Sequence, residues 1–381
     1  MAPHPEKPEF VFTGPLTVAG RYLRCFWQPI YESRNLAPAK AISIRILNED
    51  FTLYRDETGS PHVVAQKCPH RGTQLSVGWV EGDSIRCFYH GWKFDPNGTC
   101  TEQPAEPRPF CEKIKIAAYP TTERLGLIFA YFGAGSPPPL PQWPEFETQE
   151  AVSSIAMIPC NYFQSAENIV DDVHVGFAHK STPELGMSVR GIVPPRVSAR
   201  ETSFGLSVRF QNSESAEENH FVMPNSCYVS YDLVYSRSSN KGSRFRMSSL
   251  FWYVPIDDLT HYHVLVTVGP PLVTEAMRQE QRIPHSVSDE IIAIIGGKSF
   301  SHKELPELGK RKPDLVRIQD GVTIVGQGAI TDRTTEHLGM SDAGVVLLRK
   351  IWLRELRSIA NGEPLTPFTG SVDLRALARG N

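Results

Sequence analysis

Four residues with metal-binding side chains stand in two short pairs. Cys68 and His70 are separated by one residue, Cys87 and His90 are separated by two, and sixteen residues lie between the pairs. Thiolate and imidazole are common ligands of zinc and iron in proteins. The spacing therefore predicts a metal centre held by two thiolates and two imidazoles.

Two kinds of centre use this ligand set. A structural zinc ion is closed by two cysteines and two histidines, but a zinc finger takes the cysteines from one loop and the histidines from a helix. Here each loop supplies one of each, which favours a Rieske [2Fe-2S] cluster, where two cysteines bind one iron and two histidines bind the other. A colourless zinc-stapled module and ordinary core histidines remain the alternatives.

A second pair of histidines lies in the stretch 162–180, which we expect to be helical. His174 and His179 are five residues apart, and on a regular helix they would diverge by about 140°. We expect Gly176 to loosen or end the turn and bring both imidazoles inward. Two histidines and one carboxylate can hold Fe(II) with positions open for O₂, although the pair alone equally fits core or surface histidines. The candidate carboxylates are Asp289, Asp314, Asp320, Asp332 and Asp342.

Both cluster loops resemble those of Rieske non-haem iron oxygenases, in the sequences Cys68-Pro-His70-Arg-Gly and Cys87-Phe-Tyr-His90-Gly-Trp. The resemblance implies that these cysteines and histidines bind a [2Fe-2S] cluster. The compact length and the runs CPHRGTQLS and FWYVPIDD resemble the homotrimeric branch that includes phthalate, carbazole and dicamba oxygenases. It implies a homotrimer without a small second type of subunit.

The run from Asn168 through Asp171 and His174 to His179 resembles the mononuclear iron motif of the same family. The resemblance implies that both histidines bind mononuclear Fe(II). It also favours Asp320 as the carboxylate ligand, because the sequence RIQDGVTIV resembles the family's downstream aspartate region. A turn aspartate before a glycine is the alternative role for Asp320.

The resemblance also gives Asp171 a role between the two centres. It implies a hydrogen bond from this residue to His174 in its own subunit, and one to a cluster histidine of a neighbouring subunit, which we expect to be His90. A carboxylate between two imidazoles fixes their tautomers. We expect Asn168, three residues earlier, to support the site from the same face.

The elements that must position these residues predict an α+β chain. A length of 381 residues favours two domains. Short β-rich runs between residues 41 and 132 predict an antiparallel domain that carries both cluster loops, including a hairpin turn at Asp95-Pro-Asn97-Gly98. Alternating residues from 197 to 268 predict further antiparallel strands. The segment 342–359 carries the apolar stripe of an amphipathic helix.

We expect four parts along the chain. An N-terminal helical segment, 1–40, should pack on the catalytic domain, with a helix in 16–32 that Pro29 ends. The Rieske domain should span 41–135, a proline-rich linker 136–150, and the catalytic domain 151–381. The resemblance implies that the last is a helix-grip (START-like) fold, a curved antiparallel sheet wrapped on a long helix.

Composition excludes several classes of function. A net charge of −3 with mixed signs and no run of basic residues argue against nucleic-acid binding. The longest apolar runs are too short to cross a membrane of about 30 Å, and no signal peptide is visible. Five of the seven cysteines lie outside the cluster loops without regular spacing, so we expect reduced thiols and a cytoplasmic protein.

These observations predict a terminal oxygenase that uses O₂ to hydroxylate, dihydroxylate or O- or N-dealkylate an aromatic compound, as in aromatic catabolism. No dinucleotide fingerprint and no plant-type ferredoxin run are present, so electrons from NAD(P)H should arrive through a separate flavin reductase, a ferredoxin or both. Aromatic residues between Phe221 and Tyr253 are candidates for the substrate pocket or the sheet core. The rival hypothesis is a Rieske electron carrier or redox sensor whose helix-grip domain binds a ligand but no mononuclear iron.

Overall fold

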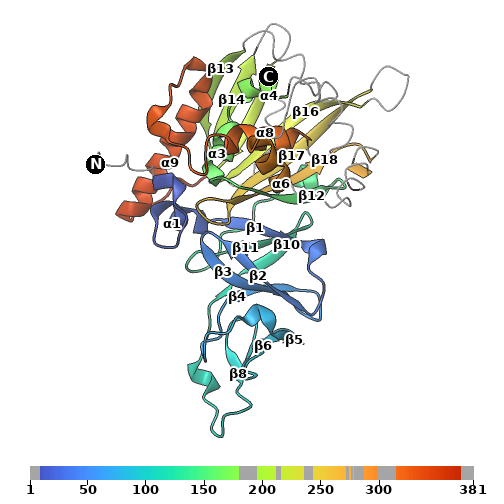
Figure 1. Ribbon diagram of the computed structural model, residues 1–381, viewed down its shortest axis with the longest axis vertical. Coiled ribbons are helices and arrows are strands. Elements are labelled where there is room, and N and C mark those ends of the chain that lie inside the picture. The colour runs from blue at the N-terminus through green and yellow to red at the C-terminus, as the bar shows by residue number, and fades with distance from the viewer. Residues whose placement is uncertain are drawn as a thin grey trace.

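The alternating residues of the second half form one seven-stranded antiparallel sheet, in the order β12-β18-β17-β16-β15-β14-β13 (Figure 1). These strands are β12 (Val152–Ile158), β13 (Arg196–Thr202), β14 (Gly205–Gln211), β15 (Ala216–Val222), β16 (Ser226–Tyr235), β17 (Ser243–Pro255) and β18 (His261–Val268). The computed structural model describes residues 9–179, 195–211, 216–235, 243–271, 274–275, 278, 287–297 and 315–369.

Helices cover this sheet and carry the candidate iron ligands. They are α3 (Tyr162–Asn168), the short 3₁₀ turn η5 (Asp172–His174), α4 (Val175–Ala178), α6 (Val287–Ile295), α8 (Leu315–Val325) and α9 (Ala343–Asn361). The long helix α9 packs on β13 and β14, α3 packs on β17, and α6 packs on β12 and α8. A curved sheet with a long helix against it agrees with the expected helix-grip architecture.

Three small antiparallel sheets form the cluster-bearing part of the chain. The first holds β1 (Trp27–Glu32), β11 (Leu127–Tyr131) and β10 (Thr121–Arg124). The second holds β2 (Lys40–Ile46), β3 (Glu49–Arg55), β4 (Pro61–Ala65) and β9 (Ala118–Tyr119). The third holds β5 (Trp79–Glu81), β6 (Ser84–Arg86), β7 (Lys93–Phe94) and β8 (Cys100–Glu102), and it lies at one end of the long axis of the molecule (Figure 1).

The expected helix over 16–32 is wrong in its second half. Helix α1 (Val18–Arg24) begins at an N-cap, Thr17, whose side chain accepts a hydrogen bond from the Gly20 N–H, and it ends before Pro29. Pro29 lies in β1, next to an irregularity in the pairing with β11. Proline is tolerated at such a place because β1 is an edge strand. Helix α1 packs on α9, with the rings of Tyr22 and Trp352 5.0 Å apart.

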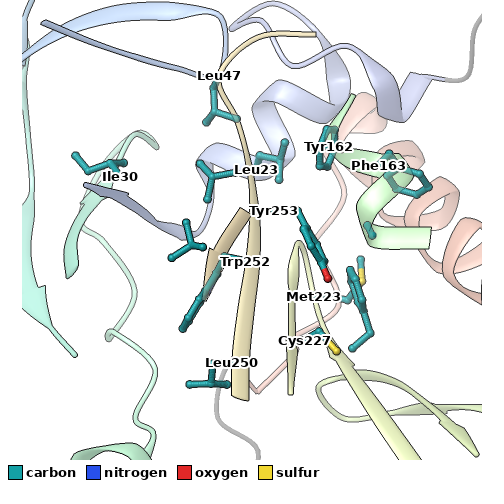
Figure 2. Close-up of a cluster of buried hydrophobic side chains, with 14 of the residues drawn as sticks. Leu23, Ile30, Leu47, Tyr162, Phe163, Met223, Cys227, Leu250, Trp252 and Tyr253 are labelled. Carbon is teal, nitrogen blue, oxygen red and sulfur yellow. The ribbon is translucent and has the colours of Figure 1, made fainter. Parts of the chain in front are cut away.

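One continuous hydrophobic core joins the first and second of these small sheets to the catalytic sheet. The third small sheet, with Cys68 and Cys87, packs around a separate core. Figure 2 shows Leu23, Ile30 and Leu47, all from the first fifty residues, in one cluster with Leu250 and Trp252 of β17. The proline-rich stretch contributes to the same core, because Trp143 and Phe146 are buried in it. A one-turn helix, α2 (Pro144–Glu147), follows most of the prolines and precedes strand β12. The expected linker is therefore anchored along part of its length.

Backbone and side-chain hydrogen bonds reinforce this junction. The N–H groups of Leu47 and Asn48, in the turn between β2 and β3, donate to the carbonyls of Pro255 and Ile256. The Asp258 carboxylate accepts from the Thr13 N–H at 2.9 Å and from Asn48 Nδ2 at 2.6 Å. Within the described ranges, no helix is long and apolar enough to cross a membrane.

Candidate metal centres

Both cluster loops are built as the same turn. The Gly72 N–H donates to the Cys68 carbonyl at 2.9 Å, and the Gly91 N–H donates to the Cys87 carbonyl at 3.1 Å. Each glycine has a positive φ, +77° for Gly72 and +74° for Gly91, a conformation that favours glycine. In each turn the cysteine is the first residue and the histidine lies at the tip.

The two turns bring their metal-binding side chains together. Cys68 and Cys87 are buried, and their thiols lie close enough to interact. The ring centroids of His70 and His90 are 4.4 Å apart. His70 Nδ1 is buried without a hydrogen-bond partner among the described residues. Two sulfurs on one side and two imidazoles on the other are the donor set of a Rieske cluster, so the residues present fit that group.

Burial, together with the neighbouring Cys87 thiol, raises the pKa of Cys68 to about 11. A thiol in this position would stay protonated unless a cation replaced the proton, as metal binding does. Aromatic packing fixes the imidazole beside it. Trp92 stacks on His70 with centroids 4.6 Å apart and an interplanar angle of 4°, and Phe110 meets Trp92 edge-on.

The second pair of histidines lies where a helix stops and restarts. Helix α3 ends at Asn168, and Asp171 then caps η5 by accepting a hydrogen bond from the Val173 N–H at 3.2 Å. Helix α4 follows and ends before His179. The expectation that Gly176 breaks the helix is wrong, because Gly176 lies inside α4. His174 lies in the 3₁₀ turn η5 and His179 follows the end of α4 in a non-helical conformation, so the two histidines are not on one regular helix and can face one point.

His174, His179 and Asp320 converge at that point. His179 Nε2 is 3.0 Å and His174 Nε2 is 3.3 Å from Asp320 Oδ1. One possible ligand atom from each residue lies within 4.8 Å of the others. Two imidazoles and a carboxylate are the donor set of the facial triad that binds Fe(II). The residues therefore fit a mononuclear iron.

The outer nitrogens of both imidazoles are held by oxygen acceptors. His179 Nδ1 is 2.7 Å from Gln319 Oε1, and His174 Nδ1 donates to the Asp171 carbonyl. Because these oxygens only accept, the Nδ1 atoms carry the protons, and each Nε2 can direct its lone pair to a metal. Sequence reasoning missed Gln319, although it lies next to Asp320 in the chain.

The electrostatics of the triad also favour a cation. Burial opposes a charge on the imidazoles, but the Asp320 carboxylate outweighs it and raises the pKa of His174 to about 9. Burial would raise the pKa of Asp320, yet the two histidines hold it well below its usual range. A carboxylate that stays ionised between two imidazoles stabilises positive charge, whether a proton or a metal ion carries it.

Asn168 and Asp171, the two residues expected to support the iron site, make different contacts in the structure. Asn168 Nδ2 donates to Asp320 Oδ1 at 3.2 Å, so it can orient the carboxylate. The expected bond between Asp171 and His174 is made by the Asp171 backbone carbonyl, while its carboxylate caps η5. Burial raises the pKa of that carboxyl despite the nearby His174.

The other candidate carboxylates lie elsewhere. Asp289 is on α6, Asp332 caps the 3₁₀ turn η8 (Arg333–Thr335), and the Asp342 carboxylate accepts from the Gly339 N–H. Asp314 is outside the described residues. Among the carboxylates considered and described, Asp320 is the one that faces the two histidines.

A buried ion-pair network ties the iron-site helix to the long helix, and sequence reasoning missed it. The Glu167 carboxylate, next to Asn168, accepts from Arg333 Nη2 and Arg349 Nε, each at 2.6 Å. Arg349 also pairs with Glu336. These bonds hold the end of α3 against α9 and thereby fix where η5 begins.

A cavity of about 290 Å³ opens beside the triad, between the helices and the inner face of the sheet. Of the aromatic region named from the sequence, Val229, Tyr231, Phe251 and Tyr253 line it, whereas Trp252 packs in the core. Strand alternation accounts for this division, because neighbouring residues of β17 point to opposite faces. A small apolar compound next to a metal site fits such a space.

Comparison with known proteins agrees with this geometry. Residues 26–120 match the family model of the Rieske [2Fe-2S] domain. The chain is 31% identical to the 5,5'-dehydrodivanillate O-demethylase oxygenase subunit of Sphingobium sp., over 92% of this chain and 79% of that protein. The chain belongs to the Rieske oxygenases, as an oxygenase subunit.

Other members of the family confirm both the class and the fold. The tert-butanol monooxygenase / tert-amyl alcohol desaturase oxygenase subunit of Aquincola tertiaricarbonis is 30% identical over 98% of this chain and 82% of that protein. A solved complex between oxygenase and ferredoxin in carbazole 1,9a-dioxygenase has a TM-score of 0.61, with 20% identity, over 87% of this chain and 91% of that one. The Rieske oxygenase is thus an enzyme, and the alternatives of a zinc module or a pure electron carrier are not supported.

Proposed function

We propose that this Rieske oxygenase holds its [2Fe-2S] cluster on Cys68, His70, Cys87 and His90, and a mononuclear Fe(II) on His174, His179 and Asp320. The convergence of both Nε2 atoms on Asp320 Oδ1 is the observation that carries the proposal. When bound, the two metal groups supply electron storage and O₂ activation. The Rieske domain would span 41–135, the linker 136–150 and the catalytic domain 151–381.

The protein's own groups prepare the iron site for this chemistry. Gln319 and the Asp171 carbonyl keep the proton on the outer nitrogen of each imidazole, and Asn168 orients the Asp320 carboxylate. His174, His179 and Asp320 would hold the iron at the edge of the cavity, which they also line. The walls of the cavity would exclude bulk water and hold a substrate next to these residues.

An aromatic compound is the substrate class that the cavity supports best. Phe251, Tyr253 and Tyr231 offer aromatic faces, and Val229 and Leu265 add aliphatic ones. The O-demethylase relative is named for an aromatic methyl ether, whereas the other relative is named for tertiary alcohols. We therefore rank O-dealkylation of an aryl ether or hydroxylation of an aromatic ring as the first candidate reaction. Oxidation of a tertiary alcohol is the second.

Electron transfer would use a second copy of the chain. The cluster-bearing strands and the iron-site helices lie toward opposite ends of the long axis (Figure 1), so one chain alone separates its two centres. Beside the cluster, Phe88 is 66% and Tyr89 is 52% exposed, and large exposed apolar groups mark interaction sites. In a homotrimer this tip would meet the neighbouring iron site, with the Asp171 carboxylate bridging to His90 of the neighbouring subunit.

The external electron source would be a ferredoxin, a flavin reductase that oxidises NAD(P)H, or both. The solved oxygenase and ferredoxin complex with the same fold supports the first. The exposed aromatic groups next to the cluster give a surface on which such a donor could also approach.

Substrate-dependent O₂ uptake tests the proposed reaction. The protein with both metal groups, a chemical reductant and a set of aryl methyl ethers should consume O₂ and release formaldehyde or a hydroxylated product. A parallel set of tertiary alcohols tests the second substrate class. Turnover of the alcohols alone would contradict the aromatic assignment, and uptake that no compound of either set stimulates would contradict the substrate proposal as a whole.

A further inference from the structure

One part of the cavity wall is polar although the proposed iron site does not use it. His263 of β18 lines the cavity, and its ring packs between Phe251 and Tyr253, with centroid distances of 5.5 and 5.4 Å. Its Nε2 atom is buried and has no hydrogen-bond partner in the described part of the chain. Since a buried polar atom without a partner is costly, a ligand that supplies the missing bond should be favoured.

Arg317 lines the same part of the cavity. It is 9% exposed, and its Nη2 donates to Ser154 Oγ at 3.0 Å. Burial and the charge of Arg317 hold the pKa of His263 well below its usual range. This wall therefore combines a neutral imidazole with a fixed guanidinium charge, and a negatively charged oxygen suits both groups better than a neutral one.

The spacing along α8 relates this wall to the triad. Arg317 and Asp320 are three residues apart, so they share one face of the helix and are offset by about 4.5 Å along its axis. That offset is on the scale of a single aromatic ring. A ring lying along the cavity could therefore place one edge at the triad and a substituent of the opposite edge at His263.

We infer that His263 and Arg317 receive an acidic oxygen substituent of the substrate, a carboxylate or a phenolate, while the reacting edge of the ring faces His174, His179 and Asp320. The inference rests on the proposed aromatic substrate and specifies it further. Val229 and Leu265 contact the ring faces, and His263 selects for the substituent. His263 is in this sense a specificity-determining residue.

Binding of matched compounds to the protein with both metal groups tests the inference without turnover. The probes are the 3- and 4-isomers of methoxybenzoate, methoxyphenol and methoxytoluene, measured anaerobically by equilibrium dialysis. At least one methoxybenzoate or methoxyphenol should bind about 10- to 100-fold more tightly than the methoxytoluene of the same geometry, the range of a hydrogen bond to a charged group. If methoxybenzoate binds more tightly than methoxyphenol, the site prefers a carboxylate, and the reverse order indicates a phenolate.

Variants at position 263 test whether His263 causes the preference for the acidic probe. His263→Phe should remove the advantage of the acidic probe and leave methoxytoluene binding unchanged, while His263→Gln, which keeps a polar donor, should restore part of it. Tyr262→Phe is the matched control, because Tyr262 precedes His263 in β18 and points to the other face of the sheet. It should bind all probes as the wild type does.

Different results would disprove the acidic substituent and the aromatic substrate. Equal binding of acidic and methyl probes by the wild type, or a His263→Phe variant that weakens all probes alike, would overturn the inference and leave the aromatic substrate standing. Failure of every aromatic probe to bind would overturn the inference and the aromatic substrate together.

Discussion

At the residue scale, metal-binding side chains with a fixed spacing were predictable, whereas most of the residues that hold them in place were not. The four cluster residues and both iron-site histidines could be proposed because ligands of one loop lie close in the chain. Asp320 needed the family resemblance, since about 140 positions separate it from His179. Gln319, Glu167 and His263 have no sequence pattern, because their roles depend on neighbours that only the folded chain supplies.

Removing the acceptor from His179 should weaken the iron site alone. Gln319→Leu loses the Oε1 acceptor at 2.7 Å, so the imidazole no longer has a fixed tautomer, and we expect the affinity for mononuclear Fe(II) to fall about 10- to 100-fold. Gln319→Glu keeps an acceptor and should retain most of the affinity. Competition with a chelator measures this, with the exposed Gln327→Leu as the matched control. Equal affinities for all the variants would contradict the positioning role.

A buried histidine away from both centres should make the protein labile to mild acid. His261 is fully buried, its Nδ1 donates to the Cys160 carbonyl, and its Nε2 accepts from Ser165. Burial lowers the pKa of His261 to about 4. The unfolded chain takes up a proton near pH 6.5 and the folded chain does not, so this residue should cost about 3 kcal/mol as pH falls from about 6.5 to 4.

The measurement is the free energy of unfolding in urea at several pH values. Wild type should lose stability steadily across this interval, and His261→Gln should show a shallower pH dependence even if it is less stable at pH 7. Because the pKa of His263 is also depressed by burial, part of the slope should remain. Identical slopes for the two proteins would contradict the assignment.

At the element scale, the strands and the long helix were predictable because their apolar patterns extend over many residues. The departure from a regular helix that brings the two histidines together was assigned to Gly176, but it is made by the 3₁₀ turn η5 and by the end of α4 at His179. Local sequence does not say where a short helix tightens or ends, because this depends on what each residue packs against. Pro29 was taken as a helix end for the same reason, because an edge strand tolerates it equally.

The contact between α9 and the iron-site segment should not tolerate a larger residue at Gly344. A Cβ there would lie 2.3 Å from the Val170 carbonyl oxygen, just before Asp171. We expect Gly344→Ala to cost about 1–3 kcal/mol of unfolding free energy as an overpacked contact and to lower the occupancy of the mononuclear iron. Val346→Ala, at an exposed position of α9, is the control. A more stable Gly344→Ala variant with full iron would contradict this packing.

At the scale of the whole molecule, the sequence indicated two domains, and in the structure one core joins the catalytic sheet to two of the three small sheets. The third small sheet and the cluster cysteines have a core of their own. Leu47 and Trp252 belong to the same buried cluster although they come from opposite sides of the proline-rich stretch. The strand order of the large sheet and this shared core arise from pairings between distant segments, which local patterns do not encode. The division into two domains therefore follows the order of segments along the chain, but the hydrophobic packing crosses the boundary between them.

Strands β3 and β4 contribute to both cores, with Leu53 and Val63 in the shared core and Tyr54 and Val64 in the core around Cys68 and Cys87. Because these strands link the two cores, we expect the cluster-bearing part and the catalytic sheet to unfold together. The visible absorbance of the cluster and the far-UV circular dichroism should change at the same temperature. Asp258→Ala, which removes the bonds to Thr13 and Asn48, should lower both midpoints equally. Asp50→Ala, at an exposed ion pair with Arg45, should change neither by much. Loss of the cluster signal well below the main transition would contradict joint unfolding.

Iron content per chain tests the central claim most directly. After anaerobic reconstitution and desalting, the wild type should hold about three irons, two in the cluster and one at His174, His179 and Asp320. His179→Ala should hold about two with an unchanged visible spectrum, and the exposed His337→Ala should still hold about three. A wild-type protein with two irons, or a His179→Ala variant that keeps three, would contradict the proposed mononuclear site.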